Sequence, residues 1–320
     1  MPFSVLILGA GSATPTLNRH PSSQLLTYES DHFLIDCGEG TQFRLLDYKV
    51  RPGRLKGIFI SHLHGDHYFG LIGLLSSLNL GGRTDDLLLF GPQGLDEVLT
   101  LQFKYSQTPL QFRIIFTQTN TTTSTLLYEH PCFTVFTIPL SHRIPCAGFL
   151  FQEKPHKRKL IKEKITDDIP FDYLRQLKNG EDIYDEGGNL LYSVAEYTLP
   201  APPPRSYAYC SDTRYDEAII PIIRGASLLY HEATFQNDLA HQASARFHAT
   251  ASEAATIAQK ANVGKLLIGH FSSRYKEVDS FLTEAQAVFP NSHIAEEGTT
   301  FNILSVPSAD ASLPPDTSEN

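Results

Sequence analysis

The segment Phe59-Ile60-Ser61-His62-Leu63-His64-Gly65-Asp66-His67 carries three histidines and one aspartate within six residues. The apolar run Gly57–Ser61 is predicted to be a β-strand that ends in a tight glycine turn. Because side chains alternate along a strand, His62 and His64 can point to the same side, and His67 opens the helix that follows. Imidazole nitrogens and carboxylate oxygens are common zinc ligands. Isolated histidines at a strand end usually just occupy the surface, but this density of ligands predicts a metal site.

Four ligands on one turn cannot complete two metal coordination spheres, so further ligands are expected from distant strand ends. Three polar residues directly follow apolar runs: His142 after Phe133–Pro139, Asp212 after Tyr207–Cys210, and His270 after Lys265–Ile268. Each is a weak signal alone, because strands commonly end in a polar residue. Together with the first segment they predict a hydrolase with a metal site of seven ligands.

The overall composition is that of an ordinary globular protein. The chain has 320 residues, 41% of them hydrophobic and 19% charged, which suits one large domain or two modest ones. The four cysteines are scattered without a C-x-x-C spacing, which favours reduced thiols in a cytoplasmic protein. The start lacks the pattern of a signal peptide, and no apolar run reaches the ~20 residues that span a bilayer, so no membrane partner is expected.

Apolar runs of strand length alternate with segments of helical periodicity. The other predicted strands are Val5–Leu8, Gln24–Tyr28, Phe33–Asp36, Phe112–Thr117, Gly148–Gln152, Leu228–Tyr230 and Thr300–Leu304. The predicted helices are Thr41–Tyr48, His67–Ser77, Gly94–Ser106, Arg214–Arg224, Ala251–Ala261 and Val278–Phe289, with a capping box of Thr250 and Glu253 before the fifth. This mixture predicts a layered α/β fold with sheet packed on sheet.

The segment Glu153–Arg205 interrupts this rhythm. It is rich in charge and in turn residues, and a stretch this long without regular structure is usually functional. We expect an inserted arm with a helix at Phe171–Lys178. Its first part is basic although the whole chain has a net charge of −9, which argues against a general nucleic-acid coat. The basic residues are Lys154, Lys157, Arg158, Lys159, Lys162 and Lys164. Such a run can also be a solvated face.

Five segments resemble the ribonuclease Z family of the metallo-β-lactamase superfamily, which removes the 3′ trailer from precursor tRNA. They are Leu8–Pro15, Ile35–Gln42, Phe59–His67, His231–Phe235 and Ile268–Tyr275. The resemblance runs from about Ser4 to about Leu304 and suits the short form of the family. It implies a four-layer αβ/βα sandwich over residues 1–306 that contains a tRNA-binding arm at about 153–205. Residues 307–320 are polar and predicted to be a disordered tail.

The resemblance also implies roles for individual residues. His62, His64 and His142 hold one Zn²⁺, Asp66, His67 and His270 hold the other, and Asp212 bridges the two. Glu232 orients His248, which protonates the leaving 3′ oxygen. The family further implies a homodimer, in which the basic residues of the arm bind the body of the tRNA through its phosphates.

Two cations about 3.5–4 Å apart lower the pKa of a shared water and neutralise the charge that develops at phosphorus. Asp66 then serves as proton acceptor as well as ligand. The leading hypothesis is a zinc-dependent endoribonuclease that leaves a 3′-hydroxyl on the tRNA and a 5′-phosphate on the trailer. One alternative is a hydrolase of small phosphodiesters, esters or lactones. Another is a non-catalytic RNA-binding protein that has kept the hydrolase fold.

Overall fold

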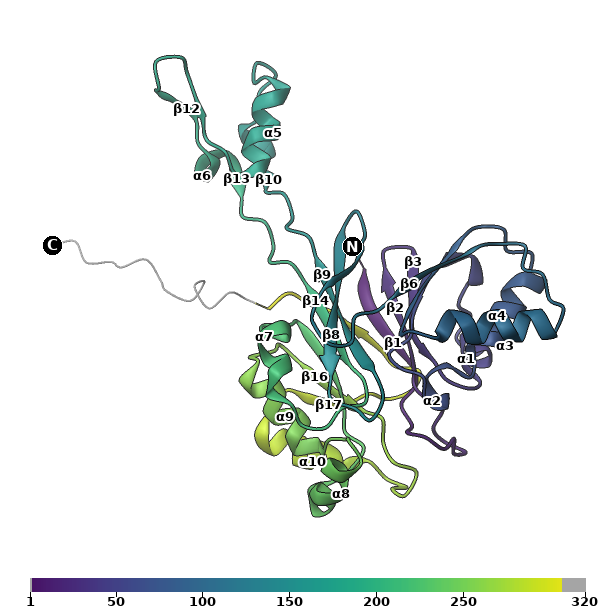
Figure 1. Ribbon diagram of the computed structural model, residues 1–320. Helices are drawn as coiled ribbons and strands as arrows, with labels where there is room; N and C mark the ends of the chain where they lie inside the picture. Colours follow the sequence, from purple (N-terminus) through teal and green to yellow (C-terminus); the bar gives the residue numbers. More distant parts are fainter. Residues whose placement is uncertain (1, 307–320) are drawn as a thin grey trace. The chain divides into compact units, whose positions relative to one another are not determined.

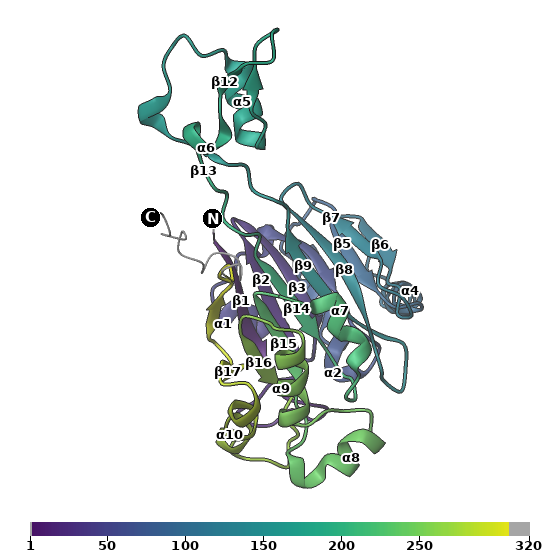
Figure 2. The same cartoon turned by 90° about the vertical axis from the view of Figure 1, so that its left-hand side faces the viewer.

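Two seven-stranded sheets form the centre of the computed structural model, which describes residues 2–306. The sheets face each other, and helices cover the outer face of each (Figure 1). In Figure 2, turned by 90°, the viewer looks along the stack, with the helices of one sheet in front and the two sheets one behind the other. This arrangement is the four-layer αβ/βα sandwich that the sequence predicts. Within residues 2–306, every helix is too short or too polar to span a bilayer.

The first sheet has the strand order β18-β1-β2-β3-β4-β5-β6. Its strands are β1 (Phe3–Gly9), β2 (Ser23–Tyr28), β3 (Asp31–Cys37), β4 (Leu55–Phe59), β5 (Leu87–Gly91), β6 (Ile114–Gln118) and β18 (Thr300–Asn302). Its helices are α1 (Thr41–Asp47), α2 (Gly65–Tyr68), α3 (Leu71–Leu80) and α4 (Leu95–Tyr105). Strands β3 to β6 are parallel, so their carboxyl ends lie at one edge of the sheet.

The second sheet has the strand order β17-β16-β15-β14-β9-β8-β7. Its strands are β7 (Leu126–Glu129), β8 (Phe133–Leu140), β9 (Cys146–Glu153), β14 (Ser206–Cys210), β15 (Leu228–Glu232), β16 (Leu266–Gly269) and β17 (Ser292–Ile294). Its helices are α7 (Ile220–Ile223), α8 (Ala240–Ala245), α9 (Ala251–Lys260) and α10 (Asp279–Val288). Strands β14, β15 and β16 are parallel, so this sheet also collects several strand ends at one edge.

Three apolar clusters separate the four layers, because side chains on a strand alternate between its faces. On β3, Phe33 and Ile35 join the cluster between the sheets, whereas Leu34 joins the cluster under the helices of the first sheet. The central cluster is rich in aromatic rings, such as Phe59 stacked on Phe90 with ring centres 4.4 Å apart. The third cluster lies between the second sheet and its helices and contains the small alanines of α9.

The segment Glu153–Arg205 belongs to a second compact unit. Its elements are β10 (Lys159–Leu160), α5 (Phe171–Asn179), β11 (Ile183–Tyr184), β12 (Leu190–Tyr192), α6 (Val194–Tyr197) and β13 (Thr198–Leu199). Strand β10 pairs with β13, and β11 pairs with β12. Nη2 of Arg205 lies 2.5 Å from Oε1 of Glu153, and this ion pair joins the two ends of the segment. The tail predicted at residues 307–320 lies outside the described residues.

Three predictions of local structure were wrong. The single helix expected at His67–Ser77 is divided into α2, which begins at Gly65, and α3. The strand expected to reach Ser61 ends at Phe59, so His62 and His64 lie on a loop. The helix expected at Arg214–Arg224 is reduced to the 3-10 turn η3 (Glu217–Ile219) and α7. The backbone before that turn instead donates hydrogen bonds to distant groups, for example from Arg214 N to the Ser141 carbonyl at 3.1 Å. These bonds hold the loop that carries Asp212 and override the helical periodicity.

The capping box at the start of α9 provides a test of the fold. The Thr250 hydroxyl accepts a hydrogen bond from the Glu253 backbone at 3.2 Å, and the Glu253 carboxylate accepts one from the Thr250 backbone at 2.8 Å. Thr250→Ala should lower the free energy of unfolding by about 1 kcal/mol, measured by urea denaturation. The control is Thr256→Ala inside α9, which should cost less because alanine is the better helix former. Equal losses for both variants would contradict the role of the cap.

Candidate metal centre

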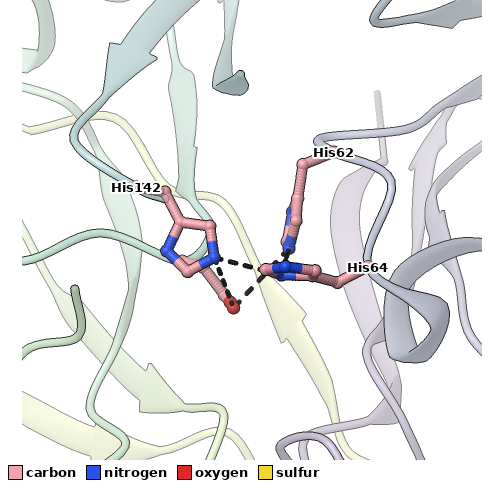
Figure 3. A group of neighbouring side chains, drawn as sticks. His62, His64 and His142 are labelled. Atoms are coloured by element: carbon pink, nitrogen blue, oxygen red, sulfur yellow. Dashed lines mark hydrogen bonds and ion pairs between the residues drawn. The ribbon is translucent and has the colours of Figure 1, made fainter. Parts of the chain in front are cut away.

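Four of the predicted ligands converge where the strands of both sheets end. His62 and His64 follow β4, His142 follows β8, and Asp212 follows β14, and their ligand atoms lie within 4.8 Å of one another. Nδ1 of His64 is 3.0 Å from Nε2 of His62 and 3.1 Å from Nε2 of His142. Figure 3 shows the three rings pointing toward one common centre. Oδ2 of Asp212 lies 3.6 Å from the His62 nitrogen.

A second group consists of Asp66, His67 and His270, together with the other oxygen of Asp212. The Nε2 atoms of His67 and His270 are 3.3 Å apart. They lie 3.5 and 3.4 Å from Oδ2 of Asp66, and 3.3 and 3.1 Å from Oδ1 of Asp212. The two oxygens of Asp212 therefore face different groups, which is the position of a bridging carboxylate.

The spacing of these atoms fits divalent metal ions. Zinc bonds of ~2.0–2.2 Å in a tetrahedral arrangement place ligand atoms roughly 3.3–3.6 Å apart. Within each group, neighbouring ligand atoms lie 3.0 to 3.8 Å apart. Oδ1 of Asp212 is buried and has no hydrogen-bond partner within residues 2–306, a costly arrangement unless a cation satisfies it. The donor set of imidazoles and carboxylates suits zinc.

The outer nitrogens of His142 and His270 fix which nitrogen carries the proton. Nδ1 of His142 lies 3.1 Å from the Phe247 carbonyl and must donate to it. Nδ1 of His270 lies 2.9 Å from the Thr234 hydroxyl, which itself donates to Glu232 at 2.8 Å and so accepts from the histidine. In both residues the proton stays on Nδ1, which leaves the lone pair of Nε2 directed into the site.

Asp36, at the end of β3, orients two further ligands. Its carboxylate accepts hydrogen bonds from the Ser61 backbone at 2.7 Å, the Ser61 hydroxyl at 2.9 Å, Nδ1 of His67 at 2.8 Å and the Tyr209 hydroxyl at 2.7 Å. Because Ser61 donates to Asp36, its hydroxyl accepts from Nδ1 of His62 at 3.0 Å. The sequence motif around Asp36 carried the family resemblance, but no role was predicted for this residue. A carboxylate at the end of a buried apolar strand was the available signal.

Electrostatics favours neutral imidazoles in the first group. Burial lowers the pKa of His62, His64 and His142, so their lone pairs are available at neutral pH. For His67, burial also acts downward, but Asp212 and the other nearby carboxylates raise the pKa well above its usual value. A metal ion bound among those carboxylates displaces such a proton, as metal binding generally does at histidine ligands.

Glu232 and His248 form a pair beside both groups. Oε1 of Glu232 lies 2.8 Å from Nδ1 of His248, while Oε1 also accepts from the Thr213 backbone at 3.0 Å. Oε2 accepts from the backbone of Thr234 at 3.0 Å and from its hydroxyl. These bonds occupy the Glu232 carboxylate, although it lies close enough to Asp212 to be a candidate ligand. Burial opposes protonation of His248, but the Glu232 carboxylate prevails and raises the histidine pKa to about 9.

Four of the predicted ligands, His64, Asp66, Asp212 and His270, line one open cavity of about 420 Å³ together with His248. Its lining residues are Ser12, Ala13, Pro15, Pro21, Glu39, His64, Gly65, Asp66, Phe69, Arg143, Asp212, His248 and His270. The structure thus brings all predicted ligands and both predicted catalytic partners to one place. Their assignment to particular metal ions stays a prediction.

The basic residues of the arm do not all behave alike. Lys157, Arg158, Lys159 and Lys162 line a concave surface of about 640 Å³, together with Lys178, which the sequence reasoning missed. Lys178 is the last basic residue of α5, and chain folding alone brings it back to the basic run. Lys164 instead pairs with Glu196 at 3.1 Å, and Lys154 does not line the surface.

Comparison with known proteins adds the decisive observation. A protein named Ribonuclease Z from Cytophaga hutchinsonii is 49% identical over 303 residues, covering 95% of this chain and 97% of the relative. A Ribonuclease Z from Bacteroides fragilis is 43% identical and covers 94% of this chain and 99% of its own. The chain belongs to the ribonuclease Z family. This ribonuclease Z family member is therefore an endoribonuclease of the metallo-β-lactamase fold, which confirms the predicted fold and enzyme class.

Solved structures agree with this ribonuclease Z assignment. The short form of human tRNase Z matches with a TM-score of 0.70 and 26% identity, covering 94% of this chain and 99% of the human chain. A metallo-β-lactamase fold protein from Bacillus subtilis matches with a TM-score of 0.66 at 22% identity, covering 94% and 100%, and supports the fold alone. A family model described as anti-Pycsar protein Apyc1 matches residues 3–127, which include the histidine-rich segment.

The network around Asp36 predicts a measurable effect on metal affinity. Asp36 has a φ of 55°, a conformation that asparagine tolerates, so Asp36→Asn should fold. The NH₂ group of the new asparagine can donate to Nδ1 of His67, which the Asp36 carboxylate cannot do. This favours the histidine tautomer with its proton on Nε2, and that proton blocks the nitrogen that binds the metal. We expect metal affinity to fall about 10–100-fold, measured by competition with a chelator. The control Tyr209→Phe removes one donor but keeps the carboxylate, and an equal loss there would contradict the tautomer argument.

Proposed function

We propose that the protein is a zinc-dependent endoribonuclease that removes the 3′ trailer from precursor tRNA. The observation that carries the proposal is Asp212, whose two oxygens face two separate groups of metal-ligating side chains. This geometry supports two Zn²⁺ per subunit, one with His62, His64 and His142 and one with Asp66, His67 and His270. The relatives named Ribonuclease Z, at 42–49% identity, support RNA as the substrate class.

Two bound cations would activate a water molecule and neutralise the charge of a phosphodiester. The chain itself then has to move two protons. Burial opposes ionisation of Asp66, but His67 and His270 hold the pKa of its carboxyl below the ordinary value, so the group is a carboxylate at neutral pH. We assign it the proton of the attacking water because it lines the cavity beside Asp212 and His270. Oδ2 of Asp66 is fixed by the Ala13 backbone N–H at 2.7 Å.

His248 supplies the second proton. Its imidazolium is held on Glu232, and it lines the same cavity as Asp212 and His270, so it can protonate the leaving 3′ oxygen. Cleavage in this direction leaves a 3′-hydroxyl on the tRNA and a 5′-phosphate on the trailer. Glu232 acts through His248, since it fixes the ring and raises the proton affinity of the histidine.

We further propose that residues 1–306 form one hydrolase domain in which the arm, 153–205, binds the tRNA. The concave surface lined by Lys157, Arg158, Lys159, Lys162 and Lys178 carries five cations. Such a surface attracts the phosphates of a folded RNA. It recognises the shape of the RNA rather than the nucleotide sequence. Lys154 and Lys164 lie in the same segment and are weaker candidates for tRNA binding.

The homodimer stays a prediction that rests on the family resemblance, and the cytoplasmic location stays one that rests on the scattered cysteines. One feature of the first sheet supports an additional contact surface. An apolar cavity of about 670 Å³ lies beside α1 and α3, and Phe43 and Leu46 of α1 are 62% and 66% exposed near it. Exposed apolar side chains gathered in this way commonly mark an interface.

The function is tested by incubating the purified protein with a labelled precursor tRNA and zinc. We expect a single cut at the 3′ end of the tRNA, with the 3′-hydroxyl and 5′-phosphate identified by end-labelling. His248→Ala should lower kcat about 10²–10⁴-fold while elemental analysis shows unchanged metal content. Glu232→Gln combined with His248→Ala should lose little more than the single variant, because the two residues act as a unit.

Three results would count against this function or against the role of His248. Absence of cleavage by protein with its metals confirmed would exclude precursor tRNA as substrate. Loss of metal together with activity in His248→Ala would show that this histidine is a ligand rather than the acid. Hydrolysis of small phosphodiesters alone would favour the second hypothesis drawn from the sequence.

The arm proposal is tested by removing two of its cations, with Lys157→Gln and Lys162→Gln in one variant. We expect a higher KM for precursor tRNA and an unchanged kcat. The slope of log affinity against log salt should fall by about 0.9 for each lost phosphate contact. Arg175→Gln is the matched control, since this exposed arginine of α5 is already paired with Asp172 at 3.2 Å. The same KM for both variants would refute the proposal.

A further inference from the structure

A second cavity, of about 540 Å³, adjoins the metal centre. Its lining residues are Ser12, Ala13, Arg143, Thr234, Phe235, Arg246, His248, Ser272, Ser273 and Arg274. It shares Ser12, Ala13, Arg143 and His248 with the cavity of the metal centre. None of the seven predicted metal ligands lines it, so it leads away from the reacting atoms on the side of His248.

The charge of this second cavity is unusual for an acidic protein. Three arginines line it, and no carboxylate is among the lining residues of the described chain. Arg143 and Arg246 are exposed, and no side-chain hydrogen bond or ion pair of either is found within residues 2–306. We call the surface formed by Arg143, Arg246 and Arg274 the arginine pocket.

Arg274 is the fixed member of the arginine pocket. Its guanidinium lies 4.9 Å from the ring centre of Phe235, and its Nε donates to the Ser272 hydroxyl at 3.2 Å. Nη1 donates to Gln242 at 3.4 Å. None of these contacts neutralises its charge. Three guanidinium groups without a counter-ion repel one another, and an anion between them would remove that cost.

A phosphate group fits this chemistry best. Guanidinium groups bind phosphate oxygens through pairs of parallel hydrogen bonds, and the hydroxyls of Ser12, Ser272 and Ser273 offer further donors. The volume of the pocket falls within the roughly 300–1,000 Å³ that holds a ligand of nucleotide size. A carboxylate would use the same donors, but the neighbouring metal centre is built for a phosphodiester.

His248 sets the direction of the bound strand. In the proposed function this residue protonates the leaving 3′ oxygen, so the ribose that carries that oxygen lies beside it. The arginine pocket begins at His248 and continues away from the ligands. We propose that the arginine pocket binds the phosphate on the 5′ side of that ribose, one linkage from the scissile phosphate. The inference rests on the proposed function and adds a binding subsite that orients the RNA strand.

The test is a double-mutant cycle between protein and substrate. One precursor tRNA carries a neutral methylphosphonate at the linkage 5′ of the nucleotide whose 3′ oxygen leaves, and a second carries it one linkage into the trailer. Single-turnover cleavage gives the apparent Kd of the metal-loaded wild-type protein and of Arg246→Gln and Arg143→Gln. Arg113→Gln is the control, because this exposed arginine pairs with Asp86 at 2.6 Å and lines neither cavity.

We expect Arg246→Gln to weaken binding of unmodified precursor roughly tenfold, as the loss of one charged hydrogen-bonded contact does. The 5′-side methylphosphonate should weaken wild-type binding by a similar factor. The two changes together should cost no more than either alone, since both remove one contact. For the trailer-side methylphosphonate, the fold-loss of binding should multiply with the fold-loss caused by Arg246→Gln, because the two changes affect separate contacts.

Independent, multiplying losses at the 5′-side linkage would overturn the inference. Coupling at the trailer-side linkage instead would also overturn it, because the strand would then run the other way. Both results leave tRNA cleavage intact and so differ from failure of the proposed function, in which no precursor is cut by the wild-type protein. Equal losses in Arg113→Gln and Arg246→Gln would reduce the effect to general charge and likewise count against the pocket.

Discussion

The position of Asp212 between two groups of imidazoles is the constraint on which the site depends. One carboxylate can face both groups only if the strand ends of the two sheets meet, because His62 and His64 come from one sheet and His142 and His270 from the other. The aromatic layer between the sheets sets that approach. The packing of the core therefore determines the geometry of the metal centre.

Burial of so many polar groups is expensive unless each has a partner. The site meets this cost with hydrogen bonds behind the ligands: Asp36 behind His67, Thr234 behind His270, and the Phe247 carbonyl behind His142. The same bonds decide the tautomers and so prepare lone pairs for metal ions. Glu232 supports both a ligand and the proposed acid: it accepts a hydrogen bond from Thr234, which contacts His270, and it pairs with His248.

Charge is divided in space in a chain whose net charge is −9. Carboxylates concentrate at the metal centre, where cations would balance them, while arginines and lysines gather in the arginine pocket and on the concave surface of the arm. An acidic protein can bind RNA in this way, since affinity depends on local cation clusters rather than on net charge. The arrangement also disfavours binding of nucleic acid elsewhere on the surface.

The sequence by itself determined the alternation of strands and helices, the histidine-rich turn and the family, because periodicity and ligand density are local properties of the chain. It failed where distant contacts overrode local preference, as at Arg214–Arg224, whose backbone bonds to Ser141 instead of forming a helix. Only the tertiary structure decided that Asp36 orients His67, that Lys178 joins the basic run, and that Arg143, Arg246 and Arg274 surround one pocket. These residues are far apart in the sequence, and only the packing of the strand ends and loops brings their side chains together.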